Sequence, residues 1–266
     1  MTELVKADLH NHFRTSSVRN QGDFNKAINM ASKRLGKGGI FGVVNFADER
    51  YEHFVDQPGY SVIPVGEEAN GVYVPEKEIL VVKGQEVPTE QGHLLVVGIG
   101  QHWHLENGRS LERTLDEAKD FGGIVVADHP FHKSGVGKYL FKNPHLLERF
   151  DAIEIHNGEV FSKSESNRAK RLYEETKKAS LKVGILSSSD GHSFYEAFRS
   201  WTAIKQPELT EKARFIQSLR ESIRSTNLET PRQETNSPFG LCDHALDLIA
   251  ITLLSKVGFK DYFSGK

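Results

Sequence analysis

Residues 123–130 read GIVVADHP, and this stretch carries most of the information about the fold. Its four apolar residues, 124–127, are typical of a strand that is buried on both faces of a parallel sheet. Asp128 and His129 follow at once, and Pro130 then stops regular structure. Residues directly after the strands of a parallel barrel lie at its carboxyl rim, where binding sites form. The stretch therefore predicts a buried parallel strand that brings His129 to such a rim.

Apolar runs of the same kind recur along the chain and alternate with helical patterns. Strands are expected at residues 5–9, 39–44, 79–87, 94–99, 124–127, 152–156, 182–186 and 201–204. Helices are expected at residues 26–35, 111–122, 140–150 and 169–179, with Ser110 as an N-cap and Gly122 as a stop. Because parallel neighbours need long crossovers, this alternation predicts an α/β fold, and the number of strands favours a closed barrel.

Two regions do not follow the alternating pattern. Residues 51–78 show no clear periodicity, and we expect an inserted loop there. From residue 207 onward the chain has a helical pattern. The sequence thus predicts a barrel over residues 1–206 and a helical C-terminal extension over residues 207–266 that packs on it. Cys242 and His244 belong to this extension, and we assign them structural roles.

Composition excludes several classes of protein. The 266 residues are 38% hydrophobic, which is enough apolar material for a core. A single cysteine rules out an internal disulfide framework and indicates a reducing compartment. The first ten residues lack an apolar signal core, so a cytoplasmic location is predicted. No apolar stretch approaches the roughly 18 residues of a membrane span. The net charge of −2 argues against an extended nucleic-acid or anionic membrane surface.

The 12 histidines are informative because of where several of them stand. His10 and His12 follow the first expected strand, in DLHNH at residues 8–12. Residues i and i+2 of a strand point to the same side, so the two imidazoles can converge on one cation at about 2.0–2.1 Å. Taken alone, the pair is weak evidence for a metal site, and two surface histidines at a strand end are the more common case.

Further residues of the metal-binding types stand at or beside the ends of other expected strands. Glu86 and His93 flank a glycine-containing turn, and a glutamate so placed can bridge two cations. His156 lies in AIEIHNGE (152–159), where Glu154 faces the same side of the strand. Asp190 and His192 follow the run 185–189 in ILSSSDGH. Each pair has a simple structural explanation when it is taken alone.

The joint pattern favours a metal centre. In a parallel barrel these strand ends share one rim, so the imidazoles and carboxylates converge there. Convergence without a cation leaves buried charges unpaired, which is costly. A mixture of imidazole and carboxylate without thiolate suits zinc, manganese or iron. The candidate ligands are too many for one four-coordinate ion, which predicts at least two ions; they are His10, His12, Glu86, His93, His129, His156, Asp190 and His192.

Six motifs, in order and in strand context, resemble the PHP (polymerase and histidinol phosphatase) domain. They are HNH (10–12), GQEVPTEQGH (84–93), DHP (128–130), IEIHNG (153–158), Asn167 in the following helix and SSSDGH (187–192). The resemblance covers about residues 6–204 and is strongest to the stand-alone phosphoesterases of that family. It implies a distorted (β/α)7 TIM-like barrel, a di- or trinuclear site at the carboxyl rim, and hydrolysis of phosphoester bonds.

The resemblance also implies how the ligands are shared. Glu86 would belong to two ions, the first completed by His10, His12 and Asp190, and the second by His93 and His129. His192 would belong to a third ion or support the ligands. Family members usually carry Thr-Asp-His after the second strand, whereas residues 43–48 here read VVNFAD. Asp48, His53 and His156 are the alternatives for the missing histidine, and its absence favours two ions over three.

The mechanism expected from this site is attack of a metal-bound hydroxide on phosphorus. Asp190, His192 and Glu86 are the candidate catalytic residues. Arg14, Arg199 and His132 are candidate contacts to the phosphate. The substrate would be a small phosphomonoester, a nucleotide or a short oligonucleotide end, because the near-neutral charge does not support a long nucleic-acid footprint.

Two other functions are compatible with parts of the sequence. The first is a catalytically silent metal-binding module with a structural or partner-binding role, which the missing histidine supports. The second is a metal-dependent amidohydrolase, another barrel with His-x-His after its first strand. It ranks lower because Glu86, and no lysine, occupies the bridging place. The sequence leaves the exact substrate, the native metal and the oligomeric state open.

Overall fold

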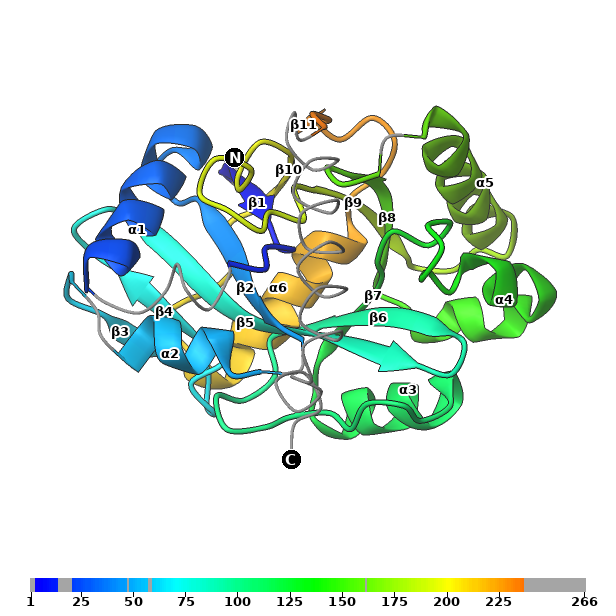
Figure 1. The fold of residues 1–266 in the computed structure, drawn as a ribbon, viewed down its shortest axis with the longest axis horizontal. Helices are drawn as coiled ribbons and strands as arrows, with labels where there is room; N and C mark the ends of the chain where they lie inside the picture. Colours follow the sequence, from blue (N-terminus) through cyan, green and yellow to red (C-terminus); the bar gives the residue numbers. More distant parts are fainter. Residues whose placement is uncertain (1–2, 14–20, 47, 57–58, 161, 237–266) are drawn as a thin grey trace, which may run out of the picture.

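The computed structural model describes residues 3–13, 21–46, 48–56, 59–160 and 162–236 (Figure 1). Its strands are β1 (Leu4–Asp8), β2 (Ile40–Asn45), β3 (Ile63–Val65), β4 (Gly71–Val74), β5 (Ile79–Thr89), β6 (Gly92–Val97), β7 (Ile124–Ala127), β8 (Ala152–Asn157), β9 (Gly184–Ser188), β10 (Trp201–Lys205) and β11 (Arg232–Gln233). Its helices are α1 (Gln21–Leu35), α2 (Arg50–Asp56), α3 (Leu111–Asp120), α4 (Gly137–Lys142), α5 (Lys163–Lys178) and α6 (Phe215–Arg224), with 3-10 helices η2 (Pro144–Arg149) and η3 (Lys212–Arg214).

The strands form one sheet that curls into a nearly closed barrel, with helices around its outside (Figure 1). The strand order is β11-β10-β1-β2-β5-β6-β7-β8-β9, and the β3–β4 hairpin pairs with β5. The barrel nearly closes where β9, at one end of this order, approaches β10, next to the other end. There the Ser187 amide of β9 donates to Thr202 Oγ1 of β10 at 2.7 Å. The predicted α/β barrel is confirmed. It is distorted because β5–β6, β6–β7 and β1–β10 pair antiparallel.

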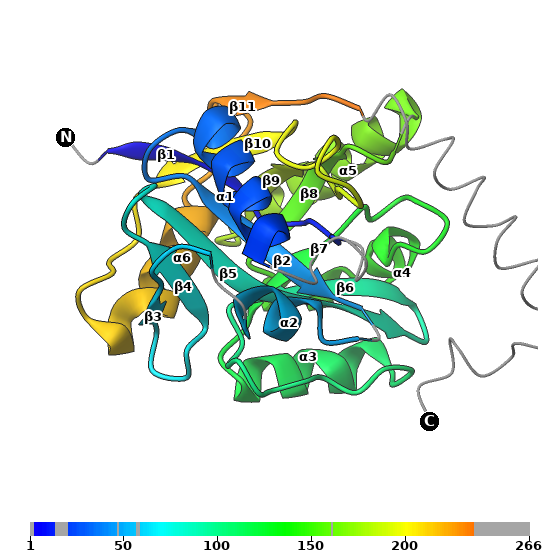
Figure 2. The same cartoon turned by 60° about the vertical axis from the view of Figure 1, so that its left-hand side comes forward.

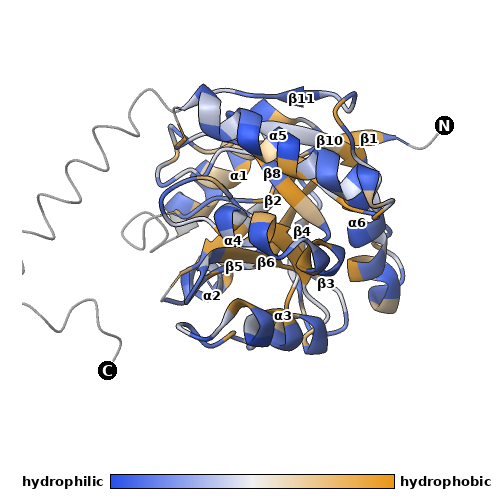
Figure 3. Cartoon of the chain, turned by 90° about the vertical axis from the view of Figure 1, so that its right-hand side faces the viewer, coloured by the Kyte–Doolittle hydropathy of each residue, from blue (hydrophilic) through white to orange (hydrophobic). Residues whose placement is uncertain are grey.

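Strand alternation divides the apolar residues between the barrel interior and the surrounding helices. On β5, Leu80 and Val82 belong to the interior cluster, whereas Ile79 and Val81 pack with residues of α1. The same division holds on β7, where Val126 faces inward and Val125 lies with residues of α3 and α5. Figure 3 shows the consequence: the strands are largely apolar and the outward faces of the helices are hydrophilic.

Helix α6 packs against the barrel and contributes to its core; Figure 2 shows its position. Its apolar face joins the interior cluster through the fully buried side chains of Phe215, Leu219 and Ile223. The buried Asp151, just before β8, accepts a hydrogen bond from Arg224 Nε at 2.6 Å. Within the expected C-terminal extension, the structure therefore has one core helix and a short strand, β11, that pairs with β10. Residues 237–266, with Cys242 and His244, lie outside the described residues.

The prediction of an inserted loop over residues 51–78 is wrong in part. The segment contains most of α2 and the whole β3–β4 hairpin, which pairs antiparallel with the first half of β5. Tyr51 and Phe54, three residues apart, are the buried face of α2. The sequence pattern failed because elements of three to seven residues contain too few repeats to show a period.

The remaining strands agree with expectation to within two residues, whereas α1 and α5 begin five and six residues earlier than expected. The strand over residues 124–127 coincides with β7. Ser110 is the N-cap of α3 and accepts a hydrogen bond from the Arg113 amide, as predicted. The helix expected over residues 140–150 is split at Asn143 into α4 and η2. None of the helices in the described ranges is long and apolar enough to cross a bilayer.

Candidate metal centre

The β5–β6 hairpin carries the carboxylate at the middle of the site. Glu86 pairs with Leu95, and His93 pairs with Pro88 two positions nearer the turn. Glu86 therefore lies within β5, which continues to Thr89, and not at the end of the strand. Its Oε1 contacts His93 Nδ1 across the hairpin. The antiparallel register thus aligns the two side chains that the sequence placed on either side of a turn.

The segment after β1 supplies two imidazoles that face each other. His10 Nε2 and His12 Nε2 lie 3.1 Å apart. His12 Nδ1 donates to the Val44 carbonyl at 3.2 Å, and His10 Nδ1 lies 3.2 Å from Glu154 Oε1. Since the Nδ1 atoms are held by these acceptors, the Nε2 atoms are the ones available for a ligand. A partner on the second nitrogen is the usual arrangement of metal-binding histidines.

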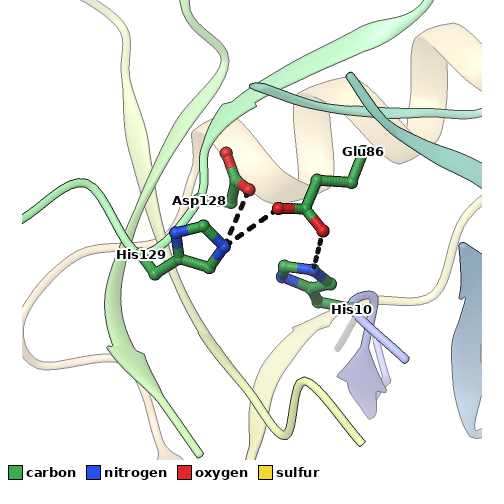
Figure 4. Close-up of side chains that lie close together, drawn as sticks. All are labelled: His10, Glu86, Asp128 and His129. Carbon is green, nitrogen blue, oxygen red and sulfur yellow. Dashed lines mark hydrogen bonds and ion pairs between the residues drawn. The ribbon is translucent and has the colours of Figure 1, made fainter. Parts of the chain in front are cut away.

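Glu86 connects these histidines with the residues after β7 (Figure 4). Its Oε2 lies 2.7 Å from His12 Nε2 and 3.7 Å from His10 Nε2. Its Oε1 lies 3.1 Å from His129 Nε2, which is also 3.2 Å from Asp128 Oδ2. The figure shows the Glu86 carboxylate between the rings of His129 and His10. His10, Glu86, Asp128 and His129 form the first buried cluster of metal-binding side chains.

His10, His12 and Asp190 form a second buried cluster. Asp190 Oδ1 lies 3.5 Å from His10 Nε2 and 3.8 Å from His12 Nε2. Asp190 Oδ2 accepts a hydrogen bond from Asn157 Nδ2 at 2.9 Å, which fixes the carboxylate. Asp190 has a φ of 50°, in the left-handed region that few residues other than glycine adopt. Such backbone strain is typical of positions where the surrounding structure dictates the side-chain direction.

The pKa values of several titratable groups in the site are shifted far from their usual values. Burial alone would raise the pKa of Glu86, but hydrogen bonds from four imidazoles hold it well below its usual value. Burial lowers the pKa of His12 to about 4. Burial also disfavours the charged form of His129, yet the carboxylates of Asp128 and Glu86 outweigh it and raise this pKa to about 10. The pKa values of an imidazole in the first cluster and of one in the second are thus shifted in opposite directions.

A divalent cation fits this arrangement. Two atoms bound to one ion at about 2.0–2.1 Å stand about 3 Å apart, which is the separation seen between the facing groups. Asp190 Oδ1 is buried without a hydrogen-bond partner among the described residues. Two facing imidazole nitrogens repel each other unless a proton or a cation lies between them. Imidazole and carboxylate donors without sulfur are the ligands of zinc, manganese and iron.

A cavity of about 480 Å³ opens onto the clusters. His192 lines it, with Nδ1 donating to the Asp190 carbonyl at 2.9 Å and its ring stacked on His12. His132 also lines the cavity, and its ring centroid lies 5.5 Å from that of His129. The structure therefore brings together seven of the predicted metal ligands around one opening: His10, His12, Glu86, His93, His129, Asp190 and His192.

Other residues named from the sequence lie elsewhere. His156 is buried beside Glu234 and Thr235, outside both clusters. Arg199 Nε donates to the Tyr195 carbonyl, and Arg199 does not line the cavity. His53 is exposed on α2. Asp48 pairs with Arg50. Arg14 lies outside the described residues.

Several residues of the site escaped the sequence analysis as functional residues, among them Asp128, Asn157 and Glu159. Asp128 belongs to the first cluster, although in an extended strand it would point away from His129. Asn157 Nδ2 donates to Asp190 and also to Glu154 at 2.8 Å. Glu159 lines the cavity, with Oε1 3.6 Å from His192 Nδ1. Their only signal was their position in the runs DHP and HNGE, directly after predicted strands.

Comparisons with known proteins support the fold. No family model matches the sequence, and no curated protein matches it. The lesion-specific endonuclease PfuEndoQ from Pyrococcus furiosus superposes with a TM-score of 0.56 and 15% identity, over 87% of this chain and 57% of its own. PsfC from Pseudomonas syringae PB-5123 superposes with a TM-score of 0.56 and 16% identity, over 95% of this chain and 99% of its own.

These similarities define the class of the molecule. The chain spans 57% of the length of the endonuclease. At such low identity the likeness establishes a shared barrel fold and nothing about activity. The fold and the site together describe a distorted α/β barrel whose buried histidine and carboxylate clusters can hold metal ions.

Proposed function

We propose that this chain is a metal-dependent phosphoesterase of the PHP type. The observation that carries the proposal is the convergence of Glu86 with imidazoles from three separate segments in one cavity. Glu86 is the shared ligand. His10, His12 and Asp190 would hold one ion, and His93, His129 and Asp128 would hold a second. Divalent ions at such a centre supply Lewis-acid activation and neutralise charge on the phosphoryl oxygens.

The residues around the ligands hold them in place. Glu154 is buried and accepts hydrogen bonds from the His129 amide at 2.7 Å and from Asn157 Nδ2, besides its contact with His10. It thereby orients a ligand from β1 and a ligand from β7 at once. Asn157 extends the network to Asp190. Such partners keep ligands preorganised, and their loss typically lowers metal affinity by about 10- to 100-fold.

His192 is the residue best placed to transfer a proton. Its ring lines the cavity, its Nδ1 donates to a backbone carbonyl, and Glu159 lies beside it. The His192 imidazole would exchange a proton with the leaving oxygen of an ester bound in the cavity, as a general acid does. His132, whose Nδ1 is 3.0 Å from Ser134 Oγ, is a second polar contact for the substrate at the mouth.

The cavity volume favours a small ligand. About 480 Å³ is in the range of pockets that enclose one small molecule. We therefore propose a phosphomonoester, a nucleotide or the end of a short oligonucleotide as substrate. The last of these is included because PfuEndoQ, which has the same fold, is a lesion-specific endonuclease.

The test is a metal-reconstituted screen. Protein loaded with zinc, manganese or iron is assayed in parallel against phosphomonoesters, cyclic nucleotides and oligonucleotides. Asp190→Ala and His10→Ala should lose bound metal and hydrolysis together while the far-UV circular dichroism stays that of the folded barrel. His53→Ala, an exposed histidine outside both clusters, is the matched control.

The outcomes separate the alternatives. Full activity in His10→Ala would refute the assigned site. Bound metal without turnover on any ester would favour the silent metal-binding module. Cyclic amides are assayed beside the esters, and their turnover in place of ester hydrolysis would favour the amidohydrolase.

A further inference from the structure

The wall of the cavity carries an uneven distribution of charge. Four carboxylates line it, namely Glu86, Asp190, Glu159 and Glu165. Arg50 is the only lining residue of the described chain with a permanent positive charge. An anionic ligand that enters the cavity is repelled by every carboxylate that is not neutralised by a bound cation. A fixed guanidinium at the same opening offsets this repulsion and offers a directional contact.

Two hydrogen bonds hold the Arg50 guanidinium in place, and its other N–H groups have no partner among the described residues. Its Nε donates to Asp48 Oδ2 at 2.7 Å, and its Nη1 donates to the His12 carbonyl at 3.2 Å. Its side chain is 18% exposed. A guanidinium has five N–H donors, so about three remain available. Among the described residues, no hydrogen-bond partner lies at Nη2.

Contacts with the barrel strands fix the backbone that carries Arg50. Asn45, the last residue of β2, accepts a hydrogen bond from the Tyr51 amide and donates to Glu52 Oε2, each at 2.7 Å. Glu52 also forms an ion pair with the buried Lys83 of β5. The start of α2 is therefore tied to two barrel strands. This preorganisation lowers the entropy that is lost when the guanidinium binds a ligand.

The position of Arg50 links it to the metal centre. It bonds to the backbone of His12, whose imidazole lies 2.7 Å from Glu86 Oε2. We infer that Arg50 binds the non-bridging oxygens of the phosphoryl group of the substrate. It would thus take the part that the sequence assigned to Arg14 and Arg199. The inference rests on the proposed phosphoesterase function for the identity of the anion.

The experiment compares the wild type with Arg50→Met, Arg50→Lys and a control, Arg149→Met. Arg149 likewise pairs with an aspartate, Asp116, and donates to a backbone carbonyl, but it lies outside the cavity. Metal content is measured first. Binding of inorganic phosphate to the metal-loaded protein is then followed by calorimetry, and KM and kcat are determined for the best ester of the screen.

We expect Arg50→Met to weaken phosphate binding and raise KM by about 10- to 100-fold, which corresponds to one charge-assisted hydrogen-bonded contact. Metal content should stay that of the wild type. Arg50→Lys keeps the charge but loses the planar fork, so its affinity should lie in between. Arg149→Met should bind phosphate as the wild type does. Asp48→Asn, which loosens the guanidinium without removing it, should raise KM by a smaller factor.

Three results would overturn the inference. The first is unchanged phosphate affinity in Arg50→Met at full metal content. The second is loss of metal in that variant, which would show that Arg50 merely supports His12. The third is a metal-loaded wild type that does not bind phosphate. A wild type that binds phosphate through Arg50 but cleaves no ester would instead refute the proposed function and leave the anion site standing.

Discussion

Glu86→Gln is the most informative single substitution, because it keeps the shape of the side chain and removes its charge. The Glu86 carboxylate touches four imidazoles, those of His10, His12, His93 and His129. An amide offers one oxygen and one NH2 group, so it cannot act as an acceptor toward both sides of the site. If Glu86 is shared by two ions, both binding sites should weaken together.

The size of the effect follows from linkage. Each ion present at 100 times its Kd stabilises the folded protein by about 2.7 kcal/mol, so two ions contribute about 5.4 kcal/mol. For a chain of this size 1 kcal/mol corresponds to roughly 2–4 °C, which predicts a rise in Tm of about 10–20 °C on metal addition. If the substitution weakens each site about 100-fold, the gain falls to about 0.4 kcal/mol per ion and the rise to a few degrees.

The assay is thermal unfolding in chelator and in zinc or manganese, with metal content measured by mass spectrometry. Glu165→Gln is the matched control, since Glu165 lines the same cavity but belongs to neither cluster. The control should keep the full shift. A Glu86→Gln protein that retains the wild-type shift and two equivalents of metal would refute the reasoning.

Three further predictions concern the frame of the site. Leu219→Ala, in the face of α6 that fills the barrel, should cost about 2–5 kcal/mol in denaturant unfolding, and a cost below about 1 kcal/mol would show that α6 is not part of the core. Lys83→Met should cost about 3–5 kcal/mol because it leaves Glu52 without its cation, and adding Glu52→Gln should recover part of this loss in a double-mutant cycle; strict additivity would contradict the pairing. Burial lowers the pKa of His156, so the unfolded state binds the proton more readily and stability should fall as the pH drops through about 6.5 toward the folded-state pKa. His156→Gln should reduce that fall between pH 7 and 5, and an unchanged pH profile would exclude the contribution.

The sequence was informative wherever an element was long or a ligand followed a buried strand. His10, His12 and His129 could be placed because apolar runs precede them and barrel strands share a rim. The register of the β5–β6 hairpin could not be predicted from the sequence, although Glu86 and His93, its two candidate metal ligands, were identified. Alternation also predicts opposite directions for neighbouring residues. The φ of 24° at His129 breaks that rule and lets Asp128 join the same cluster.

A second departure from regular strand geometry explains His156. The pairing of β8 with β9 shifts register between Glu154 and His156. Glu154 and Asn157 consequently face the two clusters, whereas His156 lies against residues near the C-terminal end of the described chain. A bulge of one residue leaves no mark in the sequence, because it depends on how two strands pair. Arg50 was overlooked for a different reason, since α2 is too short for its period to be read.

The wide spacing of the ligands has a consequence for biosynthesis. Residue 10 and residue 190 meet in the second cluster, so a nascent chain has no complete centre until β9 has left the ribosome. The first cluster is different, because a fragment that ends just after β7 already contains all four of its residues. If the proposed ions bind, occupancy of the second cluster, unlike that of the first, would require the last parallel strand of the barrel to be in place.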